Sequence, residues 1–567
     1  MSILDWLVLL STLVFITIYG IYKGRGSKNI EGYLLGNKTM PWYTIGFSIM
    51  ATQASAITFL SAPGQAFTDG MRFLQFYFGL PVAMVVLCVT VVPIFHRLKI
   101  YTAYEYLENR FDLKTRSLGA LLFLIQRGLA AGLTIYAPAI ILSSLLGWNI
   151  YLTNIFIGGI VVIYTMAGGT RAVSYTQLGQ MAIIFGGIGL AAYLLFQMLP
   201  PQLSFNDVVT IAGKTGKLNL VDFTFDLNNR YNIWSGLIGG FFLAMAYFGT
   251  DQSQVGRYLT GKSITEIRFG LLFNGVVKIP MQLFILFIGA LLYVFYIFHP
   301  QPLFFNQVEV NKVKSGQYSP QYSALENSFA DIQDSRKQVT LDLVKGVNTN
   351  DENLTESSTT ELRQIEKETK QIRQDAKELM IKNNSFADVN DTNYIFLKFV
   401  TDYLPEGIIG LLIAVIFAAS MSSTSSELNA LASTSIVDIY KRSINKTGSD
   451  RHYVRASKWA TVAWGIYAIA VAEFANRLGS LIEAVNILGS IFYGTILGIF
   501  LVGFYMKKIG GDAVFISAII AEIVVILCYN FTSISFLWYN VIGCLLVMSL
   551  AFLLEMVMKK PVSGTAV

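Results

Sequence analysis

The chain of 567 residues has a composition that excludes an ordinary soluble domain. Hydrophobic residues make up 54% of it and charged residues only 14%, whereas soluble domains carry about 25% charged residues; the mean hydropathy is +0.53. The formal net charge of +6 comes without a basic stripe interleaved with aromatic residues, so the sequence does not predict nucleic-acid binding. The three cysteines lie in apolar segments, which favours packing over disulfides or metal ligation: Cys88, Cys528 and Cys544.

Thirteen apolar segments are candidates for membrane-spanning helices, because such a helix needs about 20 mostly apolar residues. The first is too long for the hydrophobic part of a signal peptide and no basic residue precedes it, so we expect a retained helix. The predicted spans are residues 3–22, 42–66, 72–96, 117–146, 150–168, 174–198, 233–255, 267–297, 395–437, 456–476, 479–505, 512–530 and 533–556.

Lys and Arg residues are distributed unequally over the loops between these segments. With the N-terminus outside, the intracellular loops and the tail hold 23 of them, and the extracellular segments other than one long insert hold five. This bias follows the positive-inside rule. It predicts an odd number of spans in the plasma (inner) membrane, with the N-terminus outside and the C-terminus in the cytoplasm.

The insert, residues 298–394, differs in character from the rest of the chain. It contains 15 acidic and 11 basic residues, and Leu362, Ile365, Ile372 and Leu379 form a narrow apolar seam at heptad-like spacing. One interpretation is a solvated helix with flexible flanks. The other is an extracellular cap or a docking helix for a partner, and the sequence alone does not decide between them.

Two ionisable residues fall well inside predicted spans. Lys278 lies in NGVVKIPMQ and Arg127 lies in the middle of the fourth segment. Ionisable groups are costly inside a bilayer, so both are candidates for a functional role. Pro280 interrupts the helix ladder just after Lys278 and leaves backbone carbonyls nearby without donors. A structural Lys278 paired with such a carbonyl is the alternative.

Two predicted spans contain interruptions. The second includes MATQASAITFLSAPG, a cluster of small and hydroxyl residues before a Pro-Gly pair, and the seventh includes AMAYFGTDQSQ, where polar residues follow an apolar run. They open two candidate five-helix blocks, residues 42–198 and 233–505. Interrupted segments at matching places in two halves indicate the midplane binding site of a transporter.

The ninth segment carries the most specific chemistry. Nine of the sixteen residues from Ser420 to Ser435 are Ser or Thr, which is also typical of close helix packing in membranes. Ala419, Ser422 and Ser423 are spaced i, i+3, i+4 and share one helical face. That face can present one carbonyl and two hydroxyl oxygens, which suit a hard cation such as sodium. A partner helix unwound at residues 51–55 could supply further carbonyls.

Taken together, these segments resemble the sodium:solute symporter family, which includes sodium/glucose, sodium/iodide, monocarboxylate, multivitamin and sialic-acid transporters. The resemblance covers nearly the whole chain except the insert. It rests on SIMATQASAITFLSAPGQAF, TAYEYLENRFDLKTR, IYAPAIIL, GTDQSQVGRYL, NGVVKIPMQ and LNALASTSIVDIYKR. It implies an all-α polytopic membrane protein of the leucine-transporter type, with two inverted five-helix repeats plus flanking helices. The implied divisions are 1–41 (extra helix and cytoplasmic loop), 42–198 (first repeat), 199–232 (extracellular loop), 233–505 (second repeat with the insert) and 506–567 (C-terminal helices and tail).

The resemblance also implies specific site residues. A sodium site would use the carbonyl oxygens of Ala51, Ala54 and Ala419 and the hydroxyls of Ser422 and Ser423, the same face that the spacing indicates. A solute site would draw on several helices, with the tyrosine on the seventh segment as a stacking gate. The implied solute-binding residues are Gln53, Ser55, Thr58, Tyr77, Tyr247, Lys278 and Asn486.

Three positions depart from the family pattern. Tyr77 stands where sugar-transporting members use a glutamate, and Ala244 replaces a polar asparagine near the gate, so a galactose site is not expected. Gln177 replaces an aspartate in the sixth segment, which favours one sodium ion per solute. The expected solute is a small polar molecule: a sugar, a sugar acid or a monocarboxylate.

The resulting hypothesis is sodium-coupled import by alternating access across the lipid bilayer. An enzyme is not expected, because His96, His299 and His452 lie at helix ends or in loops without an HExxH or nucleophile motif, and no filter motif indicates a channel. The alternative is a membrane receptor in which a symporter-like domain only senses its solute. The sequence does not predict an oligomeric state.

Overall fold

The computed structural model describes residues 1–24, 32, 35, 38–385, 387–475 and 480–558. The predicted cytoplasmic loop 23–38 falls largely outside these ranges, and the tail from 559 falls wholly outside them. Within the described ranges the regular elements are all helical, and the β-type pairing is limited to an isolated bridge between Met40 and Gly261. This confirms the predicted all-α class.

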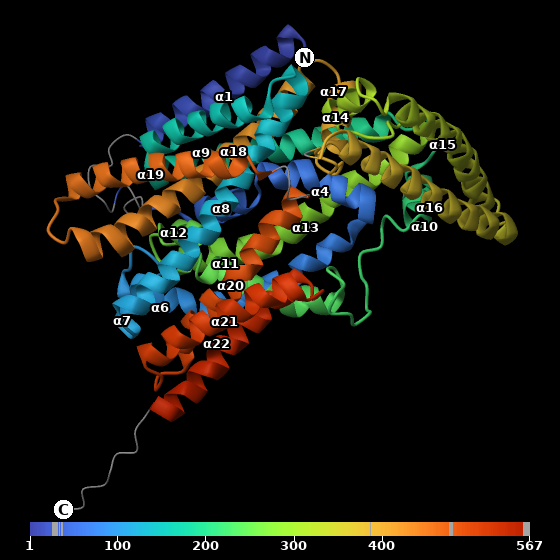
Figure 1. Cartoon of the computed structure of the whole chain (residues 1–567). Coiled ribbons are helices and arrows are strands. Elements are labelled where there is room, and N and C mark those ends of the chain that lie inside the picture. Colours follow the sequence, from blue (N-terminus) through green and yellow to red (C-terminus); the bar gives the residue numbers. More distant parts are fainter. Residues whose placement is uncertain (25–31, 33–34, 36–37, 386, 476–479, 559–567) are drawn as a thin grey trace, which may run out of the picture.

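The helices of the first half, up to the break in the seventh predicted span, are drawn from blue to green in Figure 1. In chain order they are α1 (Ile3–Gly24), α3 (Trp42–Gln53), α4 (Ala56–Asp69), η2 (Met71–Tyr77), α5 (Leu80–Val89), α6 (Val91–Leu98), α7 (Glu105–Arg110), α8 (Leu113–Leu146), α9 (Ile150–Gln197), α10 (Phe205–Lys214), η3 (Ser235–Gly239) and α11 (Gly240–Gly249).

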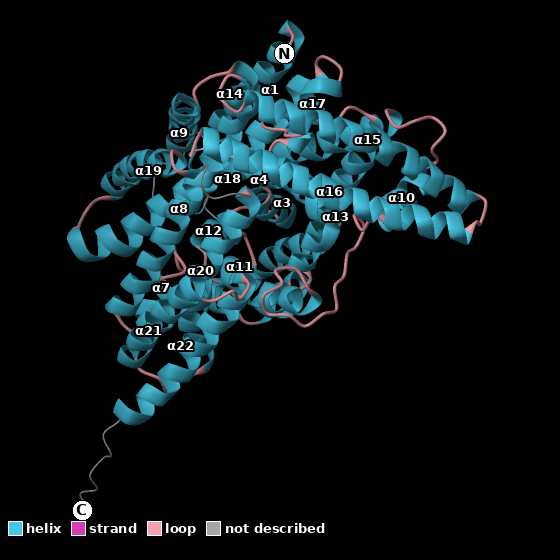
Figure 2. Ribbon diagram, turned by 45° about the vertical axis from the view of Figure 1, so that its right-hand side comes forward, coloured by secondary structure: helices cyan, strands magenta, loops and turns pink. Residues whose placement is uncertain are grey.

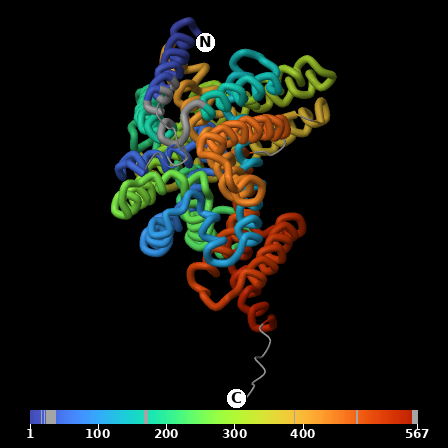
Figure 3. Tube along the Cα trace, turned by 90° about the vertical axis from the view of Figure 1, so that its left-hand side faces the viewer, coloured from blue at the N-terminus to red at the C-terminus, as the bar shows by residue number. Residues whose placement is uncertain are grey.

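The second half contains the insert and the C-terminal helices. Its elements are α12 (Gln252–Tyr258), α13 (Ile264–Phe298), α14 (Gln307–Lys314), α15 (Ser319–Asn348), α16 (Glu352–Asn383), α17 (Ile395–Tyr403), α18 (Ile408–Thr434), η4 (Ser435–Ile444), α19 (Asp450–Ala472), α20 (Leu481–Tyr505), α21 (Gly511–Phe531) and α22 (Phe536–Met558). Figures 1 and 3 both place α21 and α22 at the opposite end of the bundle from α1.

The apolar helices agree with the predicted spans in position, except that the span predicted at 395–437 begins at Ile408, because residues 404–407 separate it from α17. Among the described residues, eight helices are long and apolar enough to cross a membrane, and the bent pair α3–α4 makes a ninth span. Three shorter apolar helices, Ile3–Ile16, Ile150–Met166 and Ser235–Gly249, match three more predicted segments. The predicted segment 456–476 lies mostly within α19. Length and composition therefore establish a polytopic membrane protein but not the total of thirteen spans.

The long helix α9 covers two predicted spans. Its 48 residues would extend about 72 Å if they were straight, more than twice the thickness of a bilayer core. The hydroxyls of Tyr164 and Thr176 nevertheless form a 2.9 Å hydrogen bond, although twelve residues of straight helix separate two positions by about 18 Å. The chain therefore turns back between these two residues, as two antiparallel spans require.

The insert forms a helical hairpin. Figure 2 shows α15 and α16 side by side, extending away from the bundle. Leu362 and Ile365 of the predicted seam pack in a core with Val339 and Leu343 of α15. The interpretation of a solvated helix with flexible flanks is thus wrong over residues 319–348, because that flank is the helix that buries the seam.

Both predicted interruptions occur. α3 and α4 meet at a 60° bend, where Ala54 ends one helix and Ser55 in extended conformation begins the next. α11 ends at Gly249, and the carboxylate of Asp251 accepts a 2.8 Å hydrogen bond from the backbone N–H of Ser253 to cap α12. The cluster of small and hydroxyl residues and the Asp cap are the local causes of these breaks.

Candidate sodium and solute sites

The break between α3 and α4 leaves backbone oxygens available as ligands. The N–H of Ala54 donates to Met50 O at 2.7 Å, and the N–H of Thr58 donates to Ser55 O at 2.9 Å. Within the described part of the chain, no backbone N–H donates to the carbonyls of Ala51 or Ala54. Carbonyls at the end of a helix need such a partner, and a cation can take that place.

The hydroxyl-rich segment of α18 lies directly beside this break. The hydroxyl of Thr52 in α3 donates to Ser426 Oγ at 3.2 Å. Ser422 and Ser423 are both buried, and the hydroxyl of Ser423 donates to Ala419 O at 3.1 Å, which leaves its oxygen lone pairs for a ligand. The structure therefore brings together the two segments that hold the predicted sodium ligands, and the donor set of neutral oxygens fits sodium.

Gln177 on α9 fills the space next to these hydroxyls. Its carboxamide nitrogen donates to the hydroxyl oxygens of Ser422 at 2.8 Å, Ser426 at 3.1 Å and Thr52 at 3.2 Å. Its carboxamide oxygen accepts from the hydroxyl of Ser48 at 2.5 Å. N–H groups therefore take one acceptor position on each of these hydroxyl oxygens, in place of the carboxylate that the family resemblance implies. A hydroxyl oxygen has two acceptor positions, so Ser422 keeps one for the predicted sodium ion.

Arg127 on α8 is held by a buried ionic network. It is 3% exposed and forms ion pairs with Asp251 and with Glu427 of α18, the latter with 3.0 Å between Nη1 and Oε1. It also contacts the hydroxyl of Tyr493 on α20, and the hydroxyl of Thr134 donates to Glu427 Oε2 at 2.9 Å. Sequence reasoning found Arg127 but missed both carboxylates. Their position inside apolar or hydroxyl-rich segments was the signal that could have identified them.

The predicted gate residue adjoins this network. The ring of Tyr247 is half-buried, with its centroid 5.9 Å from the ring of Tyr493 and 5.4 Å from the guanidinium carbon of Arg127. Its hydroxyl accepts a 2.6 Å hydrogen bond from Gln254 Nε2. Tyr247 is therefore positioned by groups on three helices, α8, α12 and α20.

Lys278 on α13 is buried without a hydrogen-bond partner. It is fully buried, its ammonium nitrogen bonds to no other described residue, and that nitrogen lies 5.5 Å from the ring centroid of Tyr77. Asn274 and Gln282, one turn to either side, are equally buried, and both polar atoms of each side chain also lack partners. Buried polar groups rarely stay unsatisfied. We call Asn274, Lys278 and Gln282 the α13 polar stripe, and its need for partners indicates a ligand or water.

Within NGVVKIPMQ, the spacing i, i+4, i+8 places the two amides of the stripe on the same helical face as Lys278. That spacing was the signal by which they could have been found. Of the other predicted solute residues, Gln53, Ser55 and Thr58 surround the break between α3 and α4, and Gln53 Oε1 is buried without a partner. Asn486 is satisfied within its own helix, where Nδ2 donates to Ile482 O at 2.7 Å.

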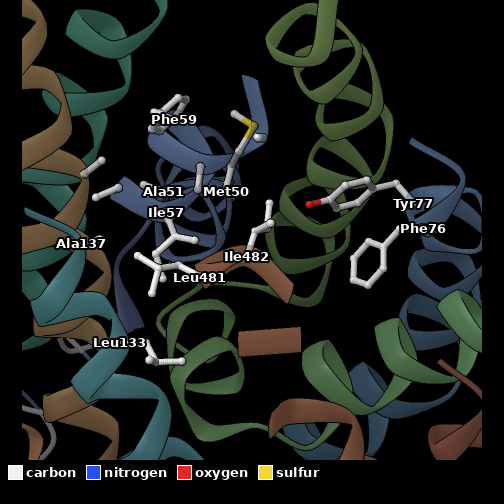
Figure 4. Close-up of a cluster of buried hydrophobic side chains, with 14 of the residues drawn as sticks. Met50, Ala51, Ile57, Phe59, Phe76, Tyr77, Leu133, Ala137, Leu481 and Ile482 are labelled. Atoms are coloured by element: carbon white, nitrogen blue, oxygen red, sulfur yellow. The ribbon is translucent and has the colours of Figure 1, made fainter. Parts of the chain in front are cut away.

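Figure 4 shows how these elements face one another. Met50 and Ala51 of α3 lie on one side of the view and Tyr77 lies on the other, with Ile482 of α20 drawn between them. α20 also contacts α4. The predicted solute residues thus come from neighbouring elements around the broken helix.

Known proteins resemble this chain over most of its length. The model of the sodium:solute symporter family matches residues 33–316 and 378–521 and leaves out only residues 317–377 between them, in the insert. The chain is 24% identical over 561 residues to the sodium/sialic acid symporter NanT of Aliivibrio fischeri, covering 97% of this chain and 92% of the relative. It is 26% identical over 502 residues to sodium-coupled monocarboxylate transporter 1 of Mus musculus, covering 88% and 68%.

A solved structure of a substrate-bound, outward-open Na⁺-coupled sialic acid symporter matches with a TM-score of 0.75 at 22% identity, covering 98% of both chains. This likeness confirms the predicted leucine-transporter-type fold. The protein is a multi-pass membrane symporter, and sodium is its coupling ion. With the family model matching well over half of its residues, the chain belongs to the sodium:solute symporter family.

Proposed function

We propose that this sodium-coupled symporter imports a small carboxylate, a sugar acid or a monocarboxylate, together with one sodium ion. The observation that carries the proposal is Lys278, a fully buried cation with no acceptor among the described residues. A buried charge needs a partner of opposite sign. A carboxylate supplies one, and the two relatives compared above are named for sialic acid and for monocarboxylates.

The α13 polar stripe can recognise both ends of such a solute. The ammonium of Lys278 donates to the carboxylate in a charge-assisted hydrogen bond. Asn274 and Gln282 each offer an amide donor and an acceptor to hydroxyl or amide groups. The ring of Tyr77 lies 5.5 Å from the ammonium nitrogen of Lys278. It stands at the position where sugar-transporting members carry a glutamate, so a negative charge that would repel an anion is absent.

The sodium ion would bind the carbonyls of Ala51, Ala54 and Ala419 and the hydroxyls of Ser422 and Ser423. Sodium there links the end of α3 to α18, and the solute binds beside the same break. Each ligand then raises the affinity of the other by the same factor.

Alternating access would expose both ligands to each side in turn, with Tyr247 as the gate. The repeats would be residues 42–198 and 233–505. The excess of Lys and Arg in the predicted intracellular loops favours an orientation with the N-terminus and the insert outside.

Uptake into proteoliposomes tests the function. Sialic acid and lactate, with glucose as the neutral comparison, are supplied under an inward gradient of sodium or of choline. Uptake of a carboxylate in sodium and not in choline is expected. Glucose uptake alone would contradict the anionic solute, and sodium-dependent binding without any uptake would favour the receptor alternative, which no observation supports.

A matched pair of variants tests the sodium ligands. Ser423→Ala removes a proposed ligand and should lower sodium-dependent uptake about 10- to 100-fold, since a hydrogen bond or ligand to a charged group is worth about 1.5–3 kcal/mol. Ser433→Ala removes a buried hydroxyl of the same helix whose partner in the described part of the chain is Ala430 O, and its uptake should stay at the wild-type level. Equal uptake by both variants would refute the site.

The stoichiometry gives a separate electrical test. One sodium ion with one monovalent carboxylate carries no net charge, so uptake should be insensitive to an imposed membrane potential. Two sodium ions would add about 2.3 kcal/mol of driving force per 100 mV. Gln177→Asp, which removes the N–H groups and adds a carboxylate, should make uptake potential-dependent and raise the Hill coefficient for sodium above one. A potential-dependent wild type would contradict the role of Gln177.

A further inference from the structure

A cavity of about 840 Å³ lies between the insert and the bundle. Phe67 and Asp69 at the end of α4 and Tyr293 of α13 form its bundle side, and Arg336 of α15 and Thr369 of α16 belong to its insert side. The volume falls in the range of small-molecule binding sites. The insert therefore does more than cover the bundle, because it shares this cavity with the C-terminal end of α4.

The cavity wall is rich in cations. Two of its basic residues are paired: Lys217 with Glu366 at 3.5 Å and Arg373 with Asp391 at 3.6 Å. Three others form no ion pair with any described carboxylate: Arg336, Lys370 and Lys377.

Arg336 is the most informative of the three. It is 2% exposed. Its guanidinium donates at 3.1 Å to the neutral oxygen of Gln301 and stacks 4.5 Å from the centroid of the Tyr293 ring, whose hydroxyl it also contacts. That hydroxyl donates to Glu366 at 3.1 Å, so the nearest carboxylate reaches Arg336 through Tyr293 and not as a direct ion pair. A buried guanidinium without a carboxylate is costly, and its planar donor set matches a carboxylate bidentately. It is therefore poised for an anion that the chain itself does not supply.

The acidic groups of the wall do not cancel this surplus. Asp69 already accepts a 2.6 Å hydrogen bond from Gln65. Asp388 accepts a 2.9 Å hydrogen bond from the hydroxyl of Tyr394, and burial raises its pKa to about 7, so that near neutral pH it is partly uncharged. The five cations of the wall thus face four carboxylates, of which one is only partly ionised.

Three further polar atoms of the wall have no hydrogen-bond partner in the described structure. They are the hydroxyl of Thr369, a residue only 6% exposed, Nε of Arg373 and Oδ2 of Asp391, the last of which faces Arg373 at 3.6 Å. Buried polar atoms without partners are few in folded proteins. The two donors among them, together with Arg336, surround one cavity, which is the pattern of a built binding site rather than of a solvated gap.

We propose that the insert and α4 form a second carboxylate-binding site, which we call the vestibule, next to the route between solvent and the α13 polar stripe. Its floor is α4, the helix that also begins with the predicted solute residues Ser55 and Thr58. The kind of ligand rests on the proposed function, since the same solute would meet both sites. The vestibule would concentrate the anion before transfer to Lys278.

The test is equilibrium binding to the purified full-length protein in choline buffer without sodium, with sialic acid and lactate as probes in isothermal titration calorimetry. Wild-type protein should bind at least one of them. Arg336→Gln should weaken that binding about tenfold or more. Lys370→Gln, an exposed position that leaves folding intact, should weaken it several-fold, and Lys367→Gln, an exposed residue of the same helix outside the cavity wall, should not change it.

Variants of the central sites separate this inference from the proposed function. Ser423→Ala and Lys278→Met should lose sodium-dependent uptake but keep the sodium-free binding. The vestibule would be refuted if the wild type did not bind a carboxylate without sodium, or if Arg336→Gln and Lys370→Gln did not weaken that binding. Sodium-dependent uptake by the wild type would still support the proposed function. Loss of all uptake in the wild type with vestibule binding retained would overturn the function alone.

Discussion

Arg127 and Lys278 are both cations buried in the membrane part of the bundle, and they differ in every other respect. Arg127 touches two carboxylates and a tyrosine hydroxyl supplied by three other elements. Lys278 has no hydrogen-bond or ion-pair partner among the described residues; the ring of Tyr77 lies near it, and the amides of Asn274 and Gln282 on its own helix also lack partners. The chain has satisfied one charge internally and has left the other for something that it does not contain.

This difference separates a structural charge from a charge directed at a ligand. Removing one partner of a satisfied buried network leaves the other charges without compensation. Removing an unsatisfied cation takes away a desolvation penalty and leaves the fold intact. Stability and transport should therefore respond in opposite ways at the two positions.

The largest effect on the fold is expected at Arg127. Arg127→Gln leaves the carboxylates of Asp251 and Glu427 buried without a cation, and should lower the free energy of unfolding by about 3–5 kcal/mol. Thermal unfolding of the detergent-purified protein measures this loss as a lower Tm. The double variant with Glu427→Gln should recover part of it. If Arg127→Gln kept the wild-type Tm, the structural role of Arg127 would be refuted.

The next effect is on transport and concerns Lys278. Lys278→Met keeps the length of the side chain and removes the charge, so the apparent KM for the carboxylate should rise about 10- to 150-fold through loss of a charge-assisted hydrogen bond. The Tm should be unchanged or higher. Lys262→Met, at an exposed position just before α13, is the control. An unchanged KM with a lower Tm would show that Lys278 is structural.

A smaller effect is expected at the two amides of the α13 polar stripe. Asn274→Leu and Gln282→Met remove neutral hydrogen-bonding groups, so each should raise the KM about two- to tenfold. Neither should lower the Tm, because no described residue loses a partner. Uptake kinetics and thermal unfolding on the same preparations give both values. A fall in Tm without a change in KM would assign the amides to packing or to bound water.

The smallest effect is expected outside the membrane, in the vestibule, where charges are partly satisfied. Burial raises the pKa of Asp388 to about 7 and lowers the pKa of Lys217 to about 8. As the pH rises from 6 to 9, Asp388 gains a negative charge and Lys217 loses a positive one, so sodium-free binding of a carboxylate should weaken by roughly two- to fivefold.

Calorimetric titrations across this pH range measure the change, and Asp388→Asn should remove the part of it between pH 6 and 8. The other ionisable groups that face the cavity are Asp69, Tyr293, Arg336, Glu366, Lys370, Arg373, Lys377 and Asp391. Burial, opposed by Arg373, raises the pKa of Asp391 to about 6, so its protonation affects only the acidic end of the titration. Binding that strengthens towards pH 9 would contradict the assignment.

The sequence predicted those features that depend on residues close together in the chain. The two broken helices follow from short clusters of small, hydroxyl and capping residues, and the pairing of the first break with Ser422 and Ser423 followed from chemistry that both segments share. The pairing of Arg127 with Asp251 and Glu427 could not be predicted, because these carboxylates are 124 and 300 residues away from it in the sequence. Only the folded bundle brings them to one point.

The insert shows a signal that was present but unused. The seam at Leu362 and Ile365 was visible as a heptad-like pattern, and apolar residues of α15 repeat at the same kind of spacing: Tyr322, Leu325, Phe329, Ile332, Val339 and Leu343. The two patterns were not paired, so the hairpin was missed. The vestibule depends on the arrangement of several separate segments around one cavity, and no local signal in any of them indicates it.

The attachment of the insert to α4 has a mechanical consequence. The hydroxyl of Ser61 donates to Asn393 at 2.7 Å, and a Cβ added at Gly64 would lie 1.9 Å from the carbonyl oxygen of Thr392, so the base of the insert is clamped onto the broken helix. The hairpin beyond it is about 45 Å long, and its tip bonds to α10, where Asn348 Nδ2 donates to Asp207 Oδ1 at 3.1 Å. A tilt of α4 by about 10° that carries α10 with it would displace the far end by about 8 Å. A spectroscopic label near Asn350 would then report each opening and closing of the transporter from a position well outside the membrane.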